Sequence, residues 1–189
     1  MGGGEVCTLM GDPTHAELLS QVRGWILEAP FIGFTPAEEP SMLKITLGRL
    51  VGRLLPNYQL KHEVLLESLS RDKDWVESVR NDPLCHNTGT LEGLAALLDR
   101  TAILSTGTIK VDKNVRSIWL GHGTNDMTCS YDKAMAWLER QTEVKDKTAK
   151  SYEGGYHQLH ADDCKDEFAA DLVDWILGRV EEAPVEAKL

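Results

Sequence analysis

The alternation of strand-like and helix-like segments is the feature that most constrains the fold of this chain. An apolar run that ends in proline occupies residues 24–30, and two further strand patterns lie at 115–120 and 149–152. A helical pattern follows each of these last two, at 131–141 and 163–180. Strands that alternate with helices are typical of a parallel sheet covered by helices, so the sequence predicts an α/β fold.

Between the first two predicted strands the pattern changes. Residues 34–100 contain helix-like segments, at about 41–56, 62–69 and 90–99, and no convincing strand. We therefore expect an inserted helical segment at 34–100, flanked by 1–33 and 101–189, which together form the sheet and its helices. The 189 residues suffice for one domain with a real core.

Composition excludes several classes of protein. The net charge of −10 argues against a general nucleic-acid binder. No apolar run reaches the roughly 18 residues that a membrane span needs. No signal-peptide pattern is present, and the four cysteines are far apart in the sequence, which is typical of free thiols in a reducing compartment. These features predict a cytoplasmic protein.

The chain starts with small residues directly before an apolar helical pattern. Met1 is followed by Gly2, Gly3 and Gly4, and the pattern continues to about residue 10. Small residues in this position are typical of the strand-to-helix turn Gly-x-Ser-x-Gly, in which the serine is a nucleophile. Met1 and Gly2 match its last two positions, so we expect the serine to be the residue just before Met1.

Two polar motifs follow the last two predicted strands. Asp126 ends the segment Gly-His-Gly-Thr-Asn-Asp, and His157 lies in Glu-Gly-Gly-Tyr-His-Gln. Active sites of open α/β sheets lie at the carboxyl ends of the strands. In the order serine, aspartate, histidine, the histidine accepts the proton of the nucleophile, and the aspartate orients the imidazole and stabilises its charged form.

Together, these motifs resemble a known family. The segments that carry the resemblance, in order along the chain, are residues 1–4, 27–30, 82–84, 121–126 and 154–159. The chain is similar to the carboxyl-terminal two thirds of the monoacylglycerol lipase and lysophospholipase group of α/β-hydrolases, also called serine aminopeptidase-like. The resemblance implies a partial α/β-hydrolase fold whose parallel sheet lacks its first strands. Residues 34–100 would be its cap or lid.

The resemblance also assigns roles. It implies that Asp126 is the acid and His157 the base of a catalytic triad, and that the backbone N–H of Met1 is an oxyanion-hole donor. The implied reaction is hydrolysis of monoacylglycerols or lysophospholipids, with no metal or organic cofactor. Without its serine the chain is expected to be inactive alone. The alternatives are a non-catalytic relative that binds lipid or a partner, and a hydrolase assembled from two chains.

The predicted cap is basic within an acidic chain. Residues 41–61 contain Lys44, Arg49, Arg53 and Lys61 and no acidic residue. An amphipathic basic helix can lie on an anionic membrane or lipid-droplet surface. It can equally pack its apolar face on the core and solvate its arginines, so both arrangements remain open at this point.

Other reactive side chains have simpler interpretations. We expect His122 to be a structural loop residue, and Cys7 to lie inside the first helix rather than to replace the nucleophile. A metal site made of His157, His160 and Asp162 lacks a recognised ligand spacing and is not expected.

Overall fold

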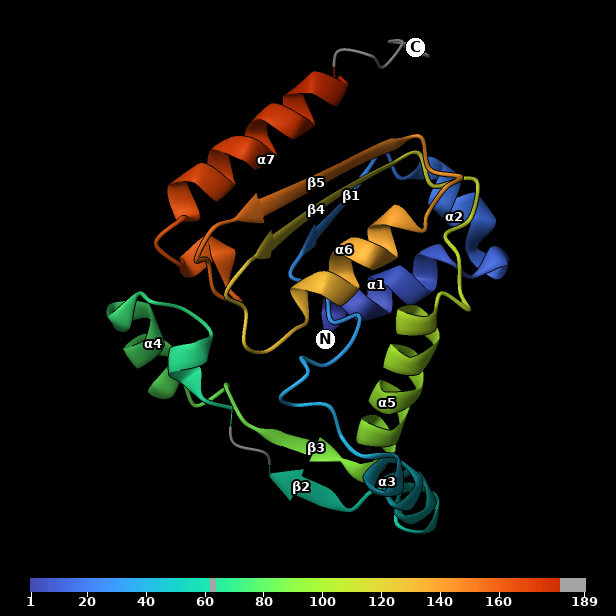
Figure 1. The fold of residues 1–189 in the computed structure, drawn as a ribbon, viewed down its shortest axis with the longest axis vertical. Helices are drawn as coiled ribbons and strands as arrows, with labels where there is room; N and C mark the ends of the chain where they lie inside the picture. Colours follow the sequence, from blue (N-terminus) through green and yellow to red (C-terminus); the bar gives the residue numbers. More distant parts are fainter. Residues whose placement is uncertain (62–63, 181–189) are drawn as a thin grey trace, which may run out of the picture.

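A parallel three-stranded sheet forms the centre of the molecule. The computed structural model describes residues 1–61 and 64–180. The strands are β1 (Trp25–Glu28), β4 (Ser117–Gly123) and β5 (Asp146–Tyr152), in the spatial order β1-β4-β5 (Figure 1). Leu120 of β4 is opposite Leu27 on one side and Ala149 on the other. The predicted α/β class is therefore confirmed.

Helices cover both faces of the sheet. Helices α1 (Gly2–Met10), α2 (Ala16–Gln21) and α6 (Tyr131–Glu139) lie on one face, and α7 (Lys165–Val180) lies on the other (Figure 1). Side chains alternate along β4, which is buried along its whole length. Ile118 and Leu120 join the core beneath α1 and α6, whereas Trp119 packs with Phe168 of α7. Successive side chains of a strand point to opposite faces, so burial along the whole of β4 shows that both faces are covered.

A long insertion separates β1 from β4. It contains α3 (Met42–Leu54), β2 (Gln59–Lys61), α4 (Lys73–Arg80), β3 (Thr88–Thr90) and α5 (Leu91–Thr106). Ser41 caps α3 by accepting a hydrogen bond from the Lys44 N–H, and Thr90 caps α5 in the same way. Figure 1 shows α3, α4 and the β2–β3 pair below the sheet, with α5 reaching from them towards α1. We call these elements the insertion.

The insertion differs from the sequence-based expectation in two respects. Strands β2 and β3 pair antiparallel where only helices were predicted. Each has three residues, too few to show an alternating pattern. Helix α4 was also missed, although Asp72 caps it through the N–H groups of Asp74 and Trp75. Of the helix predicted at 62–69, residues 62–63 lie outside the described residues, and the rest forms only a short 3-10 turn, η2 (Leu66–Ser68).

The other predicted helices agree closely with the observed ones. The predicted helices at 2–10, 41–56, 131–141 and 163–180 correspond to α1, α3, α6 and α7. Helix α5 continues to Thr106, so the expected division at residue 100 falls inside it, and that division stays a prediction. No helix in the part of the chain that the structure describes is long and apolar enough to cross a membrane.

Candidate active site

The two predicted catalytic residues meet at the carboxyl edge of the sheet. Asp126 follows β4 and His157 follows β5, and the two loops are hydrogen bonded through the Asn125 N–H and the Gly155 carbonyl, 3.0 Å apart. A Cβ atom on Gly123 would lie 2.2 Å from the Gly155 oxygen. Glycine is therefore required where the loops cross, and this close approach brings Asp126 and His157 together.

Asp126 is a buried carboxylate with three donors. Its Oδ1 accepts hydrogen bonds from the backbone N–H groups of Thr128 and Cys129, at 2.7 and 2.9 Å, and its Oδ2 lies 2.8 Å from Nδ1 of His157. Burial raises the pKa of Asp126. The hydrogen bond from His157, the charge of His157 and the hydrogen bond from the Cys129 N–H lower this pKa by more than burial raises it. The net pKa lies below the ordinary range of an aspartate. Asp126 is thus ionised at neutral pH.

The ionised carboxylate determines the tautomer of His157. Because a carboxylate can only accept, Nδ1 of His157 carries a proton and its N–H donates a hydrogen bond to Asp126. The Nε2 atom then has a free lone pair. The His157 side chain is 16% exposed, whereas that of Asp126 is fully buried. A histidine held in this way can accept a proton at Nε2 from a neighbouring hydroxyl.

A second histidine faces the same carboxylate. His122 is fully buried and lies within β4, so the expectation of a loop residue was wrong. Its Nδ1 is 3.1 Å from the Gly123 carbonyl, which can only accept, so Nδ1 carries the proton. Its Nε2, 3.8 Å from Oδ2 of Asp126, has no hydrogen-bond partner among the described residues. Burial lowers the pKa of His122, which keeps it neutral. In the sequence, the Gly-His-Gly motif was the only feature that pointed to His122 as part of the site.

Cys129 completes the surroundings of Asp126. Ligand atoms of Asp126, Cys129 and His157 lie within 4.8 Å of one another, an arrangement that could hold a metal ion. However, burial and the charge of Asp126 raise the pKa of the Cys129 thiol, and metal ligation requires a thiolate. The cluster therefore fits a metal poorly, and sequence spacing did not single out Cys129.

Helix α1 begins at this site. A Cβ atom on Gly3 would lie 2.9 Å from Cα of Pro30, in the segment that follows the carboxyl end of β1. A Cβ atom on Gly4 would lie 2.7 Å from the Phe31 carbonyl, so glycine lets the first turn of α1 contact the segment after β1. The structure thus places the start of α1 at the carboxyl edge of the sheet. Its role as an oxyanion-hole donor stays a prediction.

The remaining candidates lie apart from this group. His160 pairs with Glu28 of β1 at 2.8 Å, and Asp162 pairs with Arg71 of the insertion at 2.7 Å. His157, His160 and Asp162 therefore do not converge on one point. Cys7 lies within α1, as expected, and its side chain is buried in the core. Nothing in the sequence pattern had indicated the pairing of Arg71 with Asp162.

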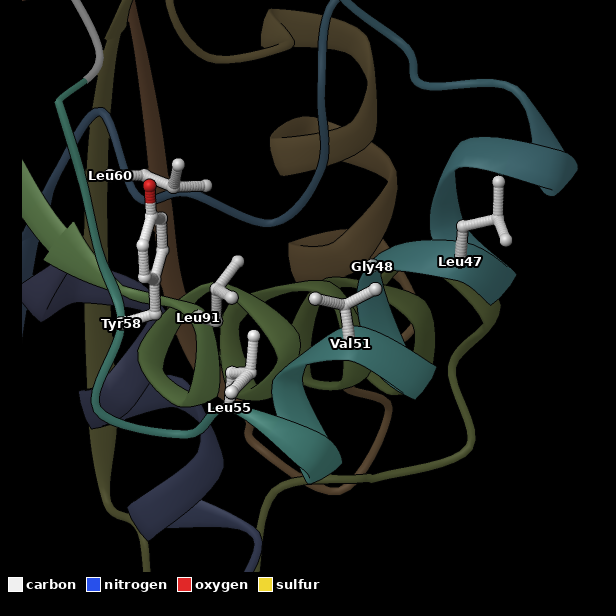
Figure 2. A pocket seen from close by; sticks show the side chains of 7 residues that line it. All are labelled: Leu47, Gly48, Val51, Leu55, Tyr58, Leu60 and Leu91. Carbon is white, nitrogen blue, oxygen red and sulfur yellow. The ribbon is translucent and has the colours of Figure 1, made fainter.

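The insertion carries the basic residues and an apolar groove. Arg49 pairs with Asp99 at 2.6 Å, whereas no ion pair involves Lys44 or Arg53 within residues 1–61 and 64–180. Helix α3 leaves most of its apolar side chains exposed. A groove of about 360 Å³ lies beside it (Figure 2), lined by Leu47, Gly48, Val51, Leu55, Tyr58, Leu60 and Leu91.

Comparison with known proteins assigns this arrangement to a family. The sequence model of the serine aminopeptidase S33 family matches residues 1–164. A putative monoglyceride lipase of Schizosaccharomyces pombe is 32% identical over 85% of this chain and 40% of its own length. Monoglyceride lipase of Rattus norvegicus is also 32% identical, over 77% of this chain and 46% of its own. The chain thus spans less than half the length of these relatives.

Solved structures share the fold. Monoacylglycerol lipase of Paleococcus ferrophilus superposes with a TM-score of 0.77 at 22% identity, over 94% of this chain and 65% of that one. A soluble variant of monoglyceride lipase from Saccharomyces cerevisiae, in complex with a substrate analog, gives a TM-score of 0.76 at 17% identity, over 94% and 62%. At these identities the likeness shows the fold, which is that of the α/β-hydrolases.

Proposed function

This chain belongs to the serine aminopeptidase S33 family of α/β-hydrolases, and from this premise we propose that it carries the acid and the base of a serine ester hydrolase. The observation that supports the proposal is the hydrogen bond of 2.8 Å between Nδ1 of His157 and the buried Asp126. It leaves Nε2 as the proton acceptor, which is what acyl transfer through a serine requires.

In the proposed reaction His157 acts at both steps. Its Nε2 takes the serine proton as the hydroxyl attacks the ester carbonyl, and returns that proton to the departing alcohol. Asp126 stays ionised and stabilises the imidazolium that forms. A water molecule, deprotonated by the same Nε2, then hydrolyses the acyl-enzyme and regenerates the serine.

We assign the nucleophile to a serine directly before Met1. No serine in the 189 residues has a glycine two positions before it, so the printed sequence contains no Gly-x-Ser turn. The first turn of α1 lies against the segment that follows β1, at the same edge of the sheet as Asp126 and His157, so a residue preceding Met1 would lie at that edge. The Met1 N–H would then be one oxyanion-hole donor.

The substrates we propose are monoacylglycerols or lysophospholipids. The monoglyceride lipases among the relatives support a lipid ester, and the apolar groove beside α3 offers a surface for an acyl chain. In this proposal the insertion is the cap, and its exposed apolar and basic residues, including Lys44 and Arg53, contact an anionic lipid surface.

The test compares the printed chain with one extended by an in-frame segment that supplies Gly-x-Ser before Met1. We expect the extended chain to hydrolyse a p-nitrophenyl ester and a monoacylglycerol, and to lose this activity on His157→Ala. The printed chain should show no measurable turnover, because removal of a triad nucleophile lowers the rate by about a million-fold. Turnover by the printed chain that His157→Ala abolishes would refute the assignment of the serine. An inactive but folded extended chain would refute the hydrolase proposal.

A second candidate is a non-catalytic relative that binds lipid. The apolar groove and exposed face of α3 favour it, because they could hold an acyl chain without any chemistry. Lipid binding by a folded extended chain that has no hydrolase activity would support this candidate instead.

A further inference from the structure

The loop that carries His157 is fixed on both sides of the histidine. The Tyr156 N–H donates to Oδ2 of Asp162 at 2.9 Å, and the Gln158 N–H donates to the Leu69 carbonyl at 2.8 Å. Leu69 belongs to the insertion, between η2 and α4. One of the two bonds that hold the backbone around His157 therefore comes from the insertion directly.

The other bond depends on the insertion through Asp162. The Asp162 side chain is 0% exposed and accepts hydrogen bonds from the backbone N–H of Arg71 at 2.8 Å, from its Nε at 3.0 Å and from its Nη2 at 2.7 Å. Burial raises the pKa of Asp162, but Arg71 and the Tyr156 N–H lower it more, and the carboxyl stays ionised. A bidentate guanidinium is the partner that best fixes a carboxylate in one orientation.

Neighbouring residues extend the contact. The Ser70 hydroxyl donates to the Ala161 carbonyl at 2.7 Å, and the Arg71 guanidinium lies 5.6 Å from the centre of the Tyr156 ring. Leu69, Ser70 and Arg71 thus all bind the histidine loop. The contact therefore involves more than one ion pair, because the consecutive residues 69–71 bind Gln158, Ala161 and Asp162 of the histidine loop.

We infer that Arg71 and Asp162 are a positioning pair, which holds His157 against Asp126 and makes that placement depend on docking of residues 69–71. The inference rests on the proposed role of His157 as the base. Neither residue touches the reacting atoms, so both act through the histidine. Movement of the insertion away from the loop would break the Gln158 bond and remove Arg71 from Asp162, so that the carboxylate holding the Tyr156 N–H would no longer be fixed.

Nuclear magnetic resonance on the full 189-residue chain tests this without any turnover. The two readouts are the downfield proton on Nδ1 of His157, which its hydrogen bond to Asp126 protects from water, and amide exchange of Gln158. In Arg71→Ala we expect the downfield resonance to broaden or disappear and Gln158 exchange to be roughly tenfold faster or more. Arg71→Lys keeps the charge but loses the bidentate geometry, so it should give a smaller change in the same direction.

The matched control is Arg80→Ala. Arg80 also lies in the insertion and pairs with Glu67 and Glu77, but it makes no contact with the histidine loop among the described interactions. It should leave both signals unchanged.

Protected amides of β4 report that each variant is folded. If Arg71→Ala does not fold, Arg71→Lys decides. Unchanged His157 and Gln158 signals in the folded Arg71 variants, or equal changes in Arg80→Ala, would overturn the inference. Failure of the extended chain to hydrolyse esters would refute the proposed function and leave these resonances as they are.

Discussion

At the scale of single residues, the site depends on the close approach of the backbone at Gly123 to the backbone at Gly155. His157 reaches Asp126 because the loops after β4 and β5 cross at Gly123, where the Gly155 carbonyl occupies the space of a side chain. Both contacting groups are backbone, so neither can move without displacing one of the two catalytic candidates.

Replacing this glycine should therefore be costly. We expect Gly123→Ala to lower the free energy of unfolding by about 1–3 kcal/mol, the usual effect of an extra methyl group in a filled space. The control is Gly178→Ala in α7, where nothing lies within 4 Å of the new Cβ. There the gain in helix propensity should stabilise the chain by about 0.5–1 kcal/mol. Urea unfolding measures both, and a stabilising Gly123→Ala would contradict the structure.

At the scale of elements, the ion pair of Arg71 with the buried Asp162 is one of the contacts that join the insertion to the loop after β5. Asp162 lies after the short 3-10 helix η3 (Leu159–Ala161), and Arg71 lies before α4, so the pair joins two segments that are 91 residues apart. Removal of one partner from a buried pair is strongly destabilising, since the other charge remains without its partner. Arg71 is about one third exposed, which moderates this cost.

The ion pair should also make stability depend on pH. The pKa of Asp162 in the folded chain is below its ordinary value of about 3.9. At pH values between the folded and the unfolded pKa, the unfolded chain therefore binds more protons than the folded chain. The resulting stabilisation is complete above the unfolded pKa and is lost as pH falls through the lower folded pKa.

We expect Asp162→Asn to lower the free energy of unfolding at pH 7 by about 1–3 kcal/mol, because the Arg71 guanidinium loses its charged acceptor. The difference from the unmodified chain should shrink as the pH falls below the unfolded pKa of about 3.9 and through the lower folded pKa. The control is Asp163→Asn, an exposed carboxyl 3.5 Å from the same Arg71, which should change stability by less than about 0.5 kcal/mol. Urea unfolding at several pH values gives the comparison. A pH-independent effect of Asp162→Asn would show that charge is not what matters.

At the scale of the whole molecule, charge and apolar surface are unevenly distributed. The chain carries a net charge of −10, yet residues 41–61 contain four basic and no acidic residues. The same stretch holds exposed apolar side chains on α3 and the groove beside it. An acidic molecule with one basic, apolar region would approach an anionic lipid surface with that region first.

Charge reversal in this region should weaken binding to lipid. We expect the double variant Lys44→Glu and Arg53→Glu to bind anionic phospholipid vesicles at least roughly 30-fold more weakly at low salt, from about 1 kcal/mol for each lost cation. The control, Lys113→Glu with Lys145→Glu, makes the same charge change at exposed positions just before β4 and β5. Vesicle flotation measures both pairs. Equal losses would point to net charge rather than to α3.

Local patterns in the sequence predicted the three strands of the parallel sheet and most helix bounds. They also placed Asp126 and His157 in the segments after β4 and β5, and the catalytic role of these two residues stays a prediction. These features depend on periodicity, caps and short motifs, which neighbouring residues encode. The three-residue strands β2 and β3 were missed because so short a segment carries no period. Only the tertiary structure decided that His122 faces Asp126 from inside β4, that Cys129 lies in the same cluster, and that Arg71 binds Asp162 beside the histidine loop. Such contacts join residues far apart along the chain or on adjoining elements, and no local pattern specifies which side chains folding will bring together.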